Sequence, residues 1–106
     1  MAQFDVHRNT GRHKASIPFV VVVQSSQFAS YQRRVVVPLV RASAVGAVPF
    51  AAFNPRFTVR GVKVVLHPLE IVSVPLEQLG AKVGSLAGSG QQIVAALDEL
   101  FSRAWN

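Results

Sequence analysis

The sequence has 106 residues, of which half are apolar and 15% are charged, a composition typical of a folded protein and not of a disordered chain. This length suits one hydrophobic core, so we expect residues 1–106 to form a single domain. The absence of cysteine excludes disulfides, thiol nucleophiles and cysteine-ligated zinc, and the net charge of +6 favours an acidic partner such as nucleic acid or an acidic protein surface.

The first half of the chain predicts three strands. Residues 3–7 alternate Phe4 and Val6 with polar neighbours, which is typical of a half-buried strand. A basic loop at residues 8–14 follows, and the valine-rich run at residues 19–23 predicts a strand that is buried on both faces. Residues 35–37 predict a further strand, which Pro38 is expected to end.

The middle of the chain predicts a β-hairpin. Residues 40–53 are rich in alanine, and both a short helix and an irregular loop stay open for them. Between residues 57 and 65, two β-forming segments flank Arg60 and Gly61, and a glycine supplies the positive φ that a tight turn needs. Residues 70–74 predict a last short strand, ended by Pro75.

The C-terminal part predicts a linker and a helix. Residues 84–90 are rich in glycine but lack the lysine and the βαβ context of a phosphate-binding loop, so we expect a flexible linker. Ser89, followed three residues later by Gln92, forms a capping box and predicts a helix from residue 91 to about residue 104. The apolar positions of this helix fall on one face: Ile93, Val94, Leu97, Leu100, Phe101 and Ala104.

No group of side chains predicts an enzyme. The three histidines are far apart in sequence, none has a carboxylate at metal-ligand spacing, and His67 is expected to be a satisfied core or edge residue. The carboxylates form no recognisable acid–base pair, and the serines form no nucleophile elbow. We therefore expect no catalytic residue, no metal ion and no cofactor, and a protein that works by binding another macromolecule.

Location follows from the same composition. A cysteine-free chain is compatible with a reducing compartment, so a cytoplasmic location is expected. The apolar stretch at residues 42–53 is too short to cross a bilayer and contains Gly46 and Pro49, so we expect no membrane contact.

Two basic groups are candidate contacts for a partner. One is the loop with Arg8, Arg12, His13 and Lys14, and the other is the pair Arg33 and Arg34. These cations suit phosphates or the acidic side chains of a protein, and a solvated strand end is the alternative. Because no aromatic residues are interleaved with them, the pattern argues against binding of single-stranded nucleic acid and favours a protein partner.

Five short blocks of sequence stand in an order and spacing similar to those of one protein family. The blocks are Gln3–Val6, Val21–Ser25, Arg33–Leu39, then Ser73 to Pro75 with Leu79, Gly80, Val83 and Leu86, and finally Ile93, Ala96, Leu97 and Phe101. Over essentially its whole length the chain resembles the CcdB family, the toxins of plasmid and chromosomal toxin–antitoxin modules.

The resemblance implies a fold and a set of partners. The fold would be mainly β with a C-terminal α-helix, its bent antiparallel sheet resembling the SH3-like barrel of the CcdB and MazF toxins. The protein would be a homodimer that binds the DNA gyrase A subunit and traps the cleaved gyrase–DNA complex. A CcdA-like antitoxin would neutralise it and join it in repressing their operon, so that operator DNA is reached only through the antitoxin complex.

Site residues also follow from the resemblance. The dimer interface would include Leu97, Leu100 and Phe101, although core packing explains these three equally well. Antitoxin binding would involve the basic loop, through Arg8, Arg12, His13 and Lys14. Gyrase binding would fall to the C-terminal residues, with Trp105 and Arg103 as the main candidates among Ser102, Arg103, Ala104, Trp105 and Asn106.

The C-terminus differs from the family pattern. Gyrase-poisoning members end with Trp-Gly-Ile directly after the Phe, whereas here three residues separate Phe101 from Trp105. Trp105 has two open interpretations, an anchor at an interface or a residue packed on its own subunit. Two alternative functions therefore stay open: a non-toxic homologue that keeps the dimer and the antitoxin contact, and a MazF-like endoribonuclease.

Overall fold

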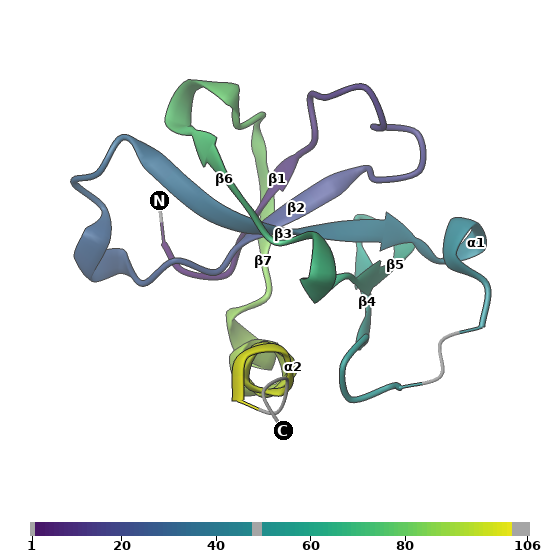
Figure 1. The fold of residues 1–106 in the computed structure, drawn as a ribbon. Helices are drawn as coiled ribbons and strands as arrows, with labels where there is room; N and C mark the ends of the chain where they lie inside the picture. Colours follow the sequence, from purple (N-terminus) through teal and green to yellow (C-terminus); the bar gives the residue numbers. More distant parts are fainter. Residues whose placement is uncertain (1, 48–49, 103–106) are drawn as a thin grey trace.

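The strands form one strongly curved antiparallel sheet, and a helix lies along one side of it (Figure 1). The structure is a computed structural model that describes residues 2–47 and 50–102. Within these residues the strand order is β4-β5-β3-β2-β1-β7, and β6 pairs with β3 beside this path. The strands are β1 Asp5–Arg8, β2 Phe19–Val22, β3 Arg33–Arg41, β4 Arg56–Val59, β5 Val62–Leu66, β6 Val72–Pro75 and β7 Lys82–Ser85, and the helices are α1 Ala42–Val45 and α2 Gly90–Ser102.

The long central strand β3 causes the curvature, because its second edge has two different neighbours. One edge pairs with β2, while the other pairs first with β6 and then with β5. The prediction that Pro38 ends this strand is wrong: β3 continues to Arg41. Pro38 lies where the neighbour changes from β6 to β5, so its missing N–H removes no bond of either ladder, and its carbonyl still accepts from the His67 N–H at 3.1 Å.

The predicted hairpin is confirmed as β4 and β5. Arg60 has φ 51° and Gly61 has φ 75°, the two positive values that a two-residue hairpin turn requires. Arg60 also donates from Nε to the carbonyl of Val83 at 3.0 Å, which ties the turn to β7. The hairpin therefore closes toward the opposite end of the sheet.

The chain after the hairpin differs from the prediction in two places. The predicted strand at residues 70–74 begins later, because Glu70 belongs to the 3₁₀ turn Pro68–Glu70, and β6 continues through Pro75. It is also not the last strand: β7 occupies part of the expected linker, with Gly84 opposite Val6 of β1. For residues 40–53 the sequence allows both a short helix and an irregular loop, and both are present. The short helix α1 follows β3, and a turn is formed at residues 51–53.

The hydrophobic core lies between one face of the sheet and α2. Its fully buried side chains include Val6, Val21, Val37, Leu39, Val64, Leu66, Ile93 and Ala96. The predicted helix is confirmed, starting at Gly90, and its predicted end near residue 104 falls outside the described residues. Its apolar face divides, because Ile93 is buried whereas Val94 is 43% exposed and Phe101 is 65% exposed. Neither helix in the described part of the chain has the length and apolar character needed to cross a bilayer.

Strand β1 is more buried than the predicted half-buried strand. Asp5 and His7 are both buried, although their polar side chains were expected to face solvent. The segment after β6 covers them, and it approaches β1 so closely that a Cβ on Gly80 would lie 2.6 Å from the carbonyl oxygen of Arg8. His7 bonds the Gly80 carbonyl through Nδ1 at 2.9 Å, and Asp5 forms an ion pair with Lys82 at 3.4 Å.

Candidate functional site

Strand β6 and the first half of β3 separate two hollows on opposite faces of the sheet. The pairs Val36 with Val72 and Val35 with Ser73 are cross-strand neighbours, and successive residues of a strand point to opposite faces. Val36, Val72 and Val74 therefore line one hollow, while Val35 and Ser73 line the other. The two hollows therefore lie back to back, on opposite faces of the paired strands β3 and β6.

The hollow lined by Val35 and Ser73, which we call the aromatic surface, is mostly apolar and has a volume of about 600 Å³. Phe28 is 44% exposed, and Tyr31 and Phe101 are each 65% exposed. The rings of Phe28 and Tyr31 meet edge to face, with centroids 6.1 Å apart. The surface is lined by Val23, Gln24, Ser25, Phe28, Tyr31, Arg33, Val35, Ile71, Ser73, Leu97 and Phe101. Large apolar side chains exposed together mark a site of interaction with another macromolecule.

Polar side chains hold the loop that carries Phe28 and Tyr31. Gln24 bridges the loop, since its Oε1 accepts from the Val35 N–H at 3.0 Å and its Nε2 donates to the Phe28 carbonyl at 3.2 Å. The guanidinium of Arg34, only 5% exposed, donates to the carbonyls of Ala29, Tyr31 and Arg33 at 2.7–2.9 Å. These bonds hold the backbone of the loop that carries the aromatic pair, which lowers the entropy cost of binding a partner there.

Arg34 corrects one expectation from the sequence. The pair Arg33 and Arg34 was expected to contact a partner, but Arg34 is buried and its guanidinium bonds the backbone of its own chain. Arg33 is exposed and bonds Ser73, through Nε to Oγ at 2.8 Å and through a second nitrogen to the carbonyl at 2.9 Å. Only Arg33 presents its side chain beside the aromatic surface.

We predict that Arg34→Met loosens the aromatic loop. The three carbonyls lose a charged donor, and hydrogen bonds to a charged group contribute about 1.5–3 kcal/mol, so the free energy of unfolding should fall by that order. Amide hydrogen exchange should quicken at Phe28, Ala29 and Tyr31, whose N–H groups bond within the loop, while exchange in the central strands changes less. Arg33→Met is the matched control, because its side chain is exposed and a change of at most about 0.5 kcal/mol is expected. Equal exchange at these amides in the two variants would contradict a clasping role for Arg34.

The residues expected at the dimer interface lie in the last turns of α2. Leu97 and Phe101 line the aromatic surface, whereas Leu100 is half-buried and is not among its lining residues. Helix α2 ends at Ser102, the first residue assigned to gyrase binding. The other four, Arg103, Ala104, Trp105 and Asn106, lie outside the described residues.

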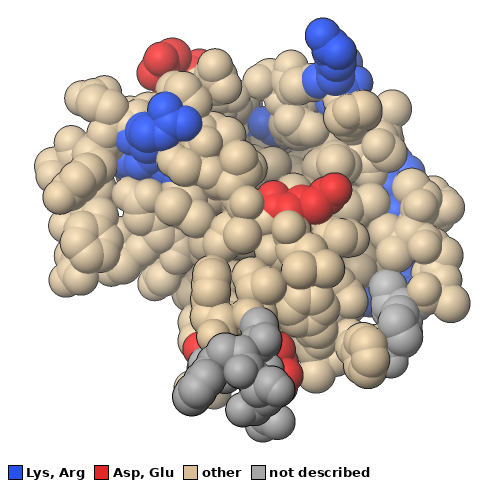
Figure 2. Space-filling model, viewed as in Figure 1, with Lys and Arg blue, Asp and Glu red and all other residues tan. Residues whose placement is uncertain are grey.

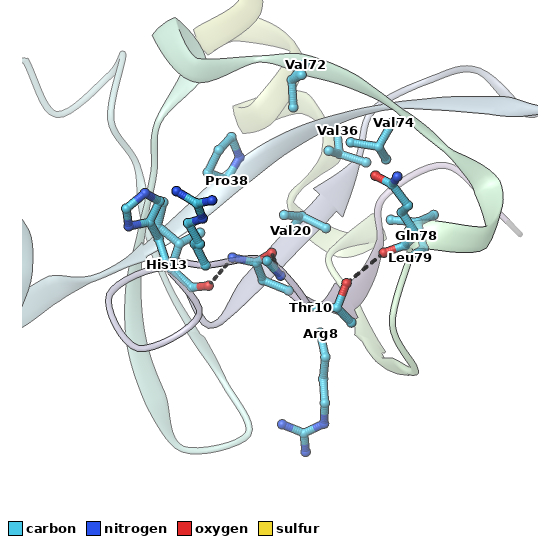
Figure 3. A pocket seen from close by; sticks show the side chains of 14 residues that line it. Arg8, Thr10, His13, Val20, Val36, Pro38, Val72, Val74, Gln78 and Leu79 are labelled. Atoms are coloured by element: carbon cyan, nitrogen blue, oxygen red, sulfur yellow. Dashed lines mark hydrogen bonds between the residues drawn. The ribbon is translucent and has the colours of Figure 1, made fainter.

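The hollow on the other face, lined by Val36, Val72 and Val74, has a volume of about 540 Å³, and we call it the loop groove. Its floor is apolar, formed by Val20, Val36 and Pro38, and β6 contributes Val72 and Val74 (Figure 3). The basic loop forms the facing wall and is anchored where the Thr10 hydroxyl donates to the Gln78 carbonyl at 2.9 Å. The remaining lining residues are Arg8, Asn9, Gly11, Arg12, His13, Ile17 and Leu79.

The structure brings three of the four predicted antitoxin-binding residues to this groove. Arg8, Arg12 and His13 line it, and the side chain of Arg8 extends away from the valines of the floor (Figure 3). Lys14 is exposed in the same loop but does not line the groove. The loop groove therefore combines an apolar floor with cations at its rim.

His67 differs from the expectation of a satisfied side chain, and His7 has a similar buried nitrogen. Nδ1 of His67 and Nε2 of His7 are buried and have no hydrogen-bond partner in the described part of the chain. Among residues 2–47 and 50–102, no three histidine or carboxylate side chains lie close enough together to hold a metal ion.

Comparison with known protein families identifies the chain. Residues 3–102 match the family described as CcdB protein. A search of curated proteins finds no match. The curved antiparallel sheet with a C-terminal helix is the fold that the sequence resemblance implied, and the family match covers nearly the whole chain. The chain therefore belongs to the CcdB family.

Proposed function

We propose that the protein is the toxin of a type II toxin–antitoxin module, formed by a single CcdB-like domain that acts in the cytoplasm. As a homodimer, it binds the DNA gyrase A subunit and traps the cleaved gyrase–DNA complex. The observation that carries the proposal is the aromatic surface, where Phe28, Tyr31 and Phe101 are exposed together beside the end of α2. Membership of the CcdB family supports gyrase as the target.

The mechanism needs no catalytic residue, metal ion or cofactor. A bound protein shifts an equilibrium only by the difference between its affinities for the two states. Contacts that form better on the cleaved gyrase–DNA complex than on the resealed one therefore raise the population of the cleaved state. Aromatic anchors suit this task because they supply large contact areas with few rotatable bonds.

The contacts extend from the aromatic surface into the C-terminal residues. Arg34 holds the backbone of the loop that carries Phe28 and Tyr31, and Phe101 adds a third ring. Ser102, Arg103, Ala104, Trp105 and Asn106 follow Phe101 in the sequence, and we assign them to the same contact. Leu97, Leu100 and Phe101 are assigned to the contact between two copies, so that a dimer unites two such surfaces.

We assign the loop groove to the antitoxin. An antitoxin segment with both acidic and apolar side chains suits this site, because the floor is apolar and Arg8, Arg12 and His13 lie around it. Lys14 adds a further positive charge in the same loop. Repression of the operon then requires the complex of the two proteins.

Incubating the protein with purified gyrase and supercoiled plasmid tests the proposal. Linear DNA should accumulate in proportion to the added protein once the gyrase is denatured. A folded protein that yields no linear DNA at excess over gyrase would overturn it and favour the non-toxic homologue. Cleavage of RNA in metal-free buffer would instead identify the endoribonuclease.

A further inference from the structure

Cations gather at one edge of the molecule without carboxylate partners. Figure 2 shows blue side chains on the upper right and along the right-hand edge, and a further blue group on the upper left; the red ones lie at the upper left, the centre and the bottom. Within residues 2–47 and 50–102, the ion pair that forms joins Lys82 to Asp5. The cations of this edge therefore have no carboxylate partner among these residues. We call this group the basic edge: Lys14 of the loop after β1, Arg41 at the end of β3, and Arg56 and Lys63 on the β4–β5 hairpin.

The hairpin provides a built hollow within the basic edge. Thr58 is the cross-strand partner of Lys63, and Arg56 lies two residues before Thr58 on the same face of the strand. All three side chains are exposed and line a hollow of about 210 Å³. Two cations and one hydroxyl therefore surround a space large enough for a phosphate group, and these are the groups that bind phosphate oxygens.

Arg41 joins the loop to the hairpin. Its register partner on β5 is Val64, the neighbour of Lys63. Its Nε donates to the Ala15 carbonyl at 3.1 Å, and its backbone N–H donates to the Ser16 carbonyl at 2.7 Å. These two bonds tie the end of the basic loop, which follows Lys14, to the end of β3, and β5 with Lys63 is the neighbouring strand of β3.

We propose that the basic edge binds the phosphate backbone of duplex DNA. Exposed Lys and Arg side chains neutralise the phosphates of duplex DNA and release their counterions, independently of the base sequence. Single-stranded nucleic acid is disfavoured because it needs exposed rings for stacking, and the exposed Phe28, Tyr31 and Phe101 belong to the aromatic surface instead. An acidic protein segment suits the loop groove better, since that site has a broad apolar floor.

The inference goes beyond the proposed function. The resemblance implied that operator DNA is reached only through the antitoxin complex, whereas the basic edge contacts DNA directly and without sequence preference. It is compatible with a protein that acts on a gyrase–DNA complex, but it does not depend on gyrase, because binding is tested with the protein alone.

Fluorescence anisotropy with a short labelled duplex in low salt tests the inference. Binding should be equal for unrelated sequences, and its logarithm should fall with the logarithm of salt concentration with a slope of about −0.9 for each phosphate contacted. The variant Arg56→Gln/Lys63→Gln should bind about tenfold more weakly, and the magnitude of its slope should fall by about 2. The matched control, Arg8→Gln/Arg33→Gln, removes the same charge at other places and should change the affinity less than about twofold.

Three outcomes would overturn the inference. One is an equal loss of affinity in the two double variants, which would indicate a response to net charge alone. Another is binding to single-stranded DNA or RNA but not to the duplex. The third is no binding by the folded wild-type protein in low salt. None of them bears on the accumulation of linear DNA by gyrase, so failure here is distinguishable from failure of the proposed function.

Discussion

Phe101→Ser should abolish the accumulation of linear DNA by gyrase while leaving the chain folded. Phe101 is 65% exposed on the last turn of α2 and lines the aromatic surface, so its loss removes contact area and little of the core. Truncating an interface anchor costs about 2–4 kcal/mol, which is a loss of about 30-fold to 1,000-fold in affinity. The measurement is a titration of linear DNA against added protein, with circular dichroism to confirm the fold.

Phe50→Ser is the matched control for this prediction. Phe50 is 68% exposed but lies near Phe53 and Glu99, outside the residues that line the aromatic surface. The control should keep wild-type activity. Equal activity of the two variants would remove Phe101 from the site, and equal loss would show that exposed rings in general matter. Phe101 is assigned both to the dimer contact and to the gyrase contact, and sedimentation of Phe101→Ser separates the two roles. A variant that stays a dimer but loses activity indicates the gyrase contact.

The hairpin and the valine-rich strand could be predicted because their signals are local. Arg60 and Gly61 between two β-forming segments contain all that a two-residue turn needs. The run that became β2 is apolar on both faces, which suits a central strand between β1 and β3. In both cases the neighbouring residues determine the conformation, so the tertiary structure only had to agree with them.

Strand β7 could not be predicted because its partner is distant in sequence. Gly84 carries no side chain and offers no alternating pattern, yet its backbone pairs with Val6 of β1. Pro38 was misinterpreted for a similar reason: a proline ends a strand only where a neighbour needs its N–H, and the switch of β3 from β6 to β5 removes that need. Both errors concern pairings that the local sequence does not encode.

The candidate site was predicted only in part. The helical period placed Leu97 and Phe101 on the apolar helix face, and the family resemblance assigned them to an interface. Phe28 and Tyr31 lie in a loop with no period, so nothing in the sequence indicated their exposure. The role of Arg34 depends on three carbonyls that converge only once the loop has folded. A pattern of charges predicts that an arginine is present, but burial decides whether it meets a partner or its own backbone.

Ile93→Ala should be the most destabilising of the single substitutions considered. Ile93 is fully buried and, with Ala96, anchors α2 in the core, and truncation of a buried isoleucine costs about 2–5 kcal/mol. That is a large share of the stability of a typical domain, about 5–15 kcal/mol. The midpoint of urea unfolding should fall without a change in slope.

Val94→Ala is the control for Ile93, because the two residues are neighbours on one helix and differ in burial. Val94 is 43% exposed, so its truncation should cost less than about 1 kcal/mol. Similar midpoints for the two variants would contradict the arrangement in which only half of the apolar helix face meets the sheet. A large difference has a functional consequence as well: the exposed half of that face, with Phe101, is available to a partner only because Ile93 holds the other half in the core.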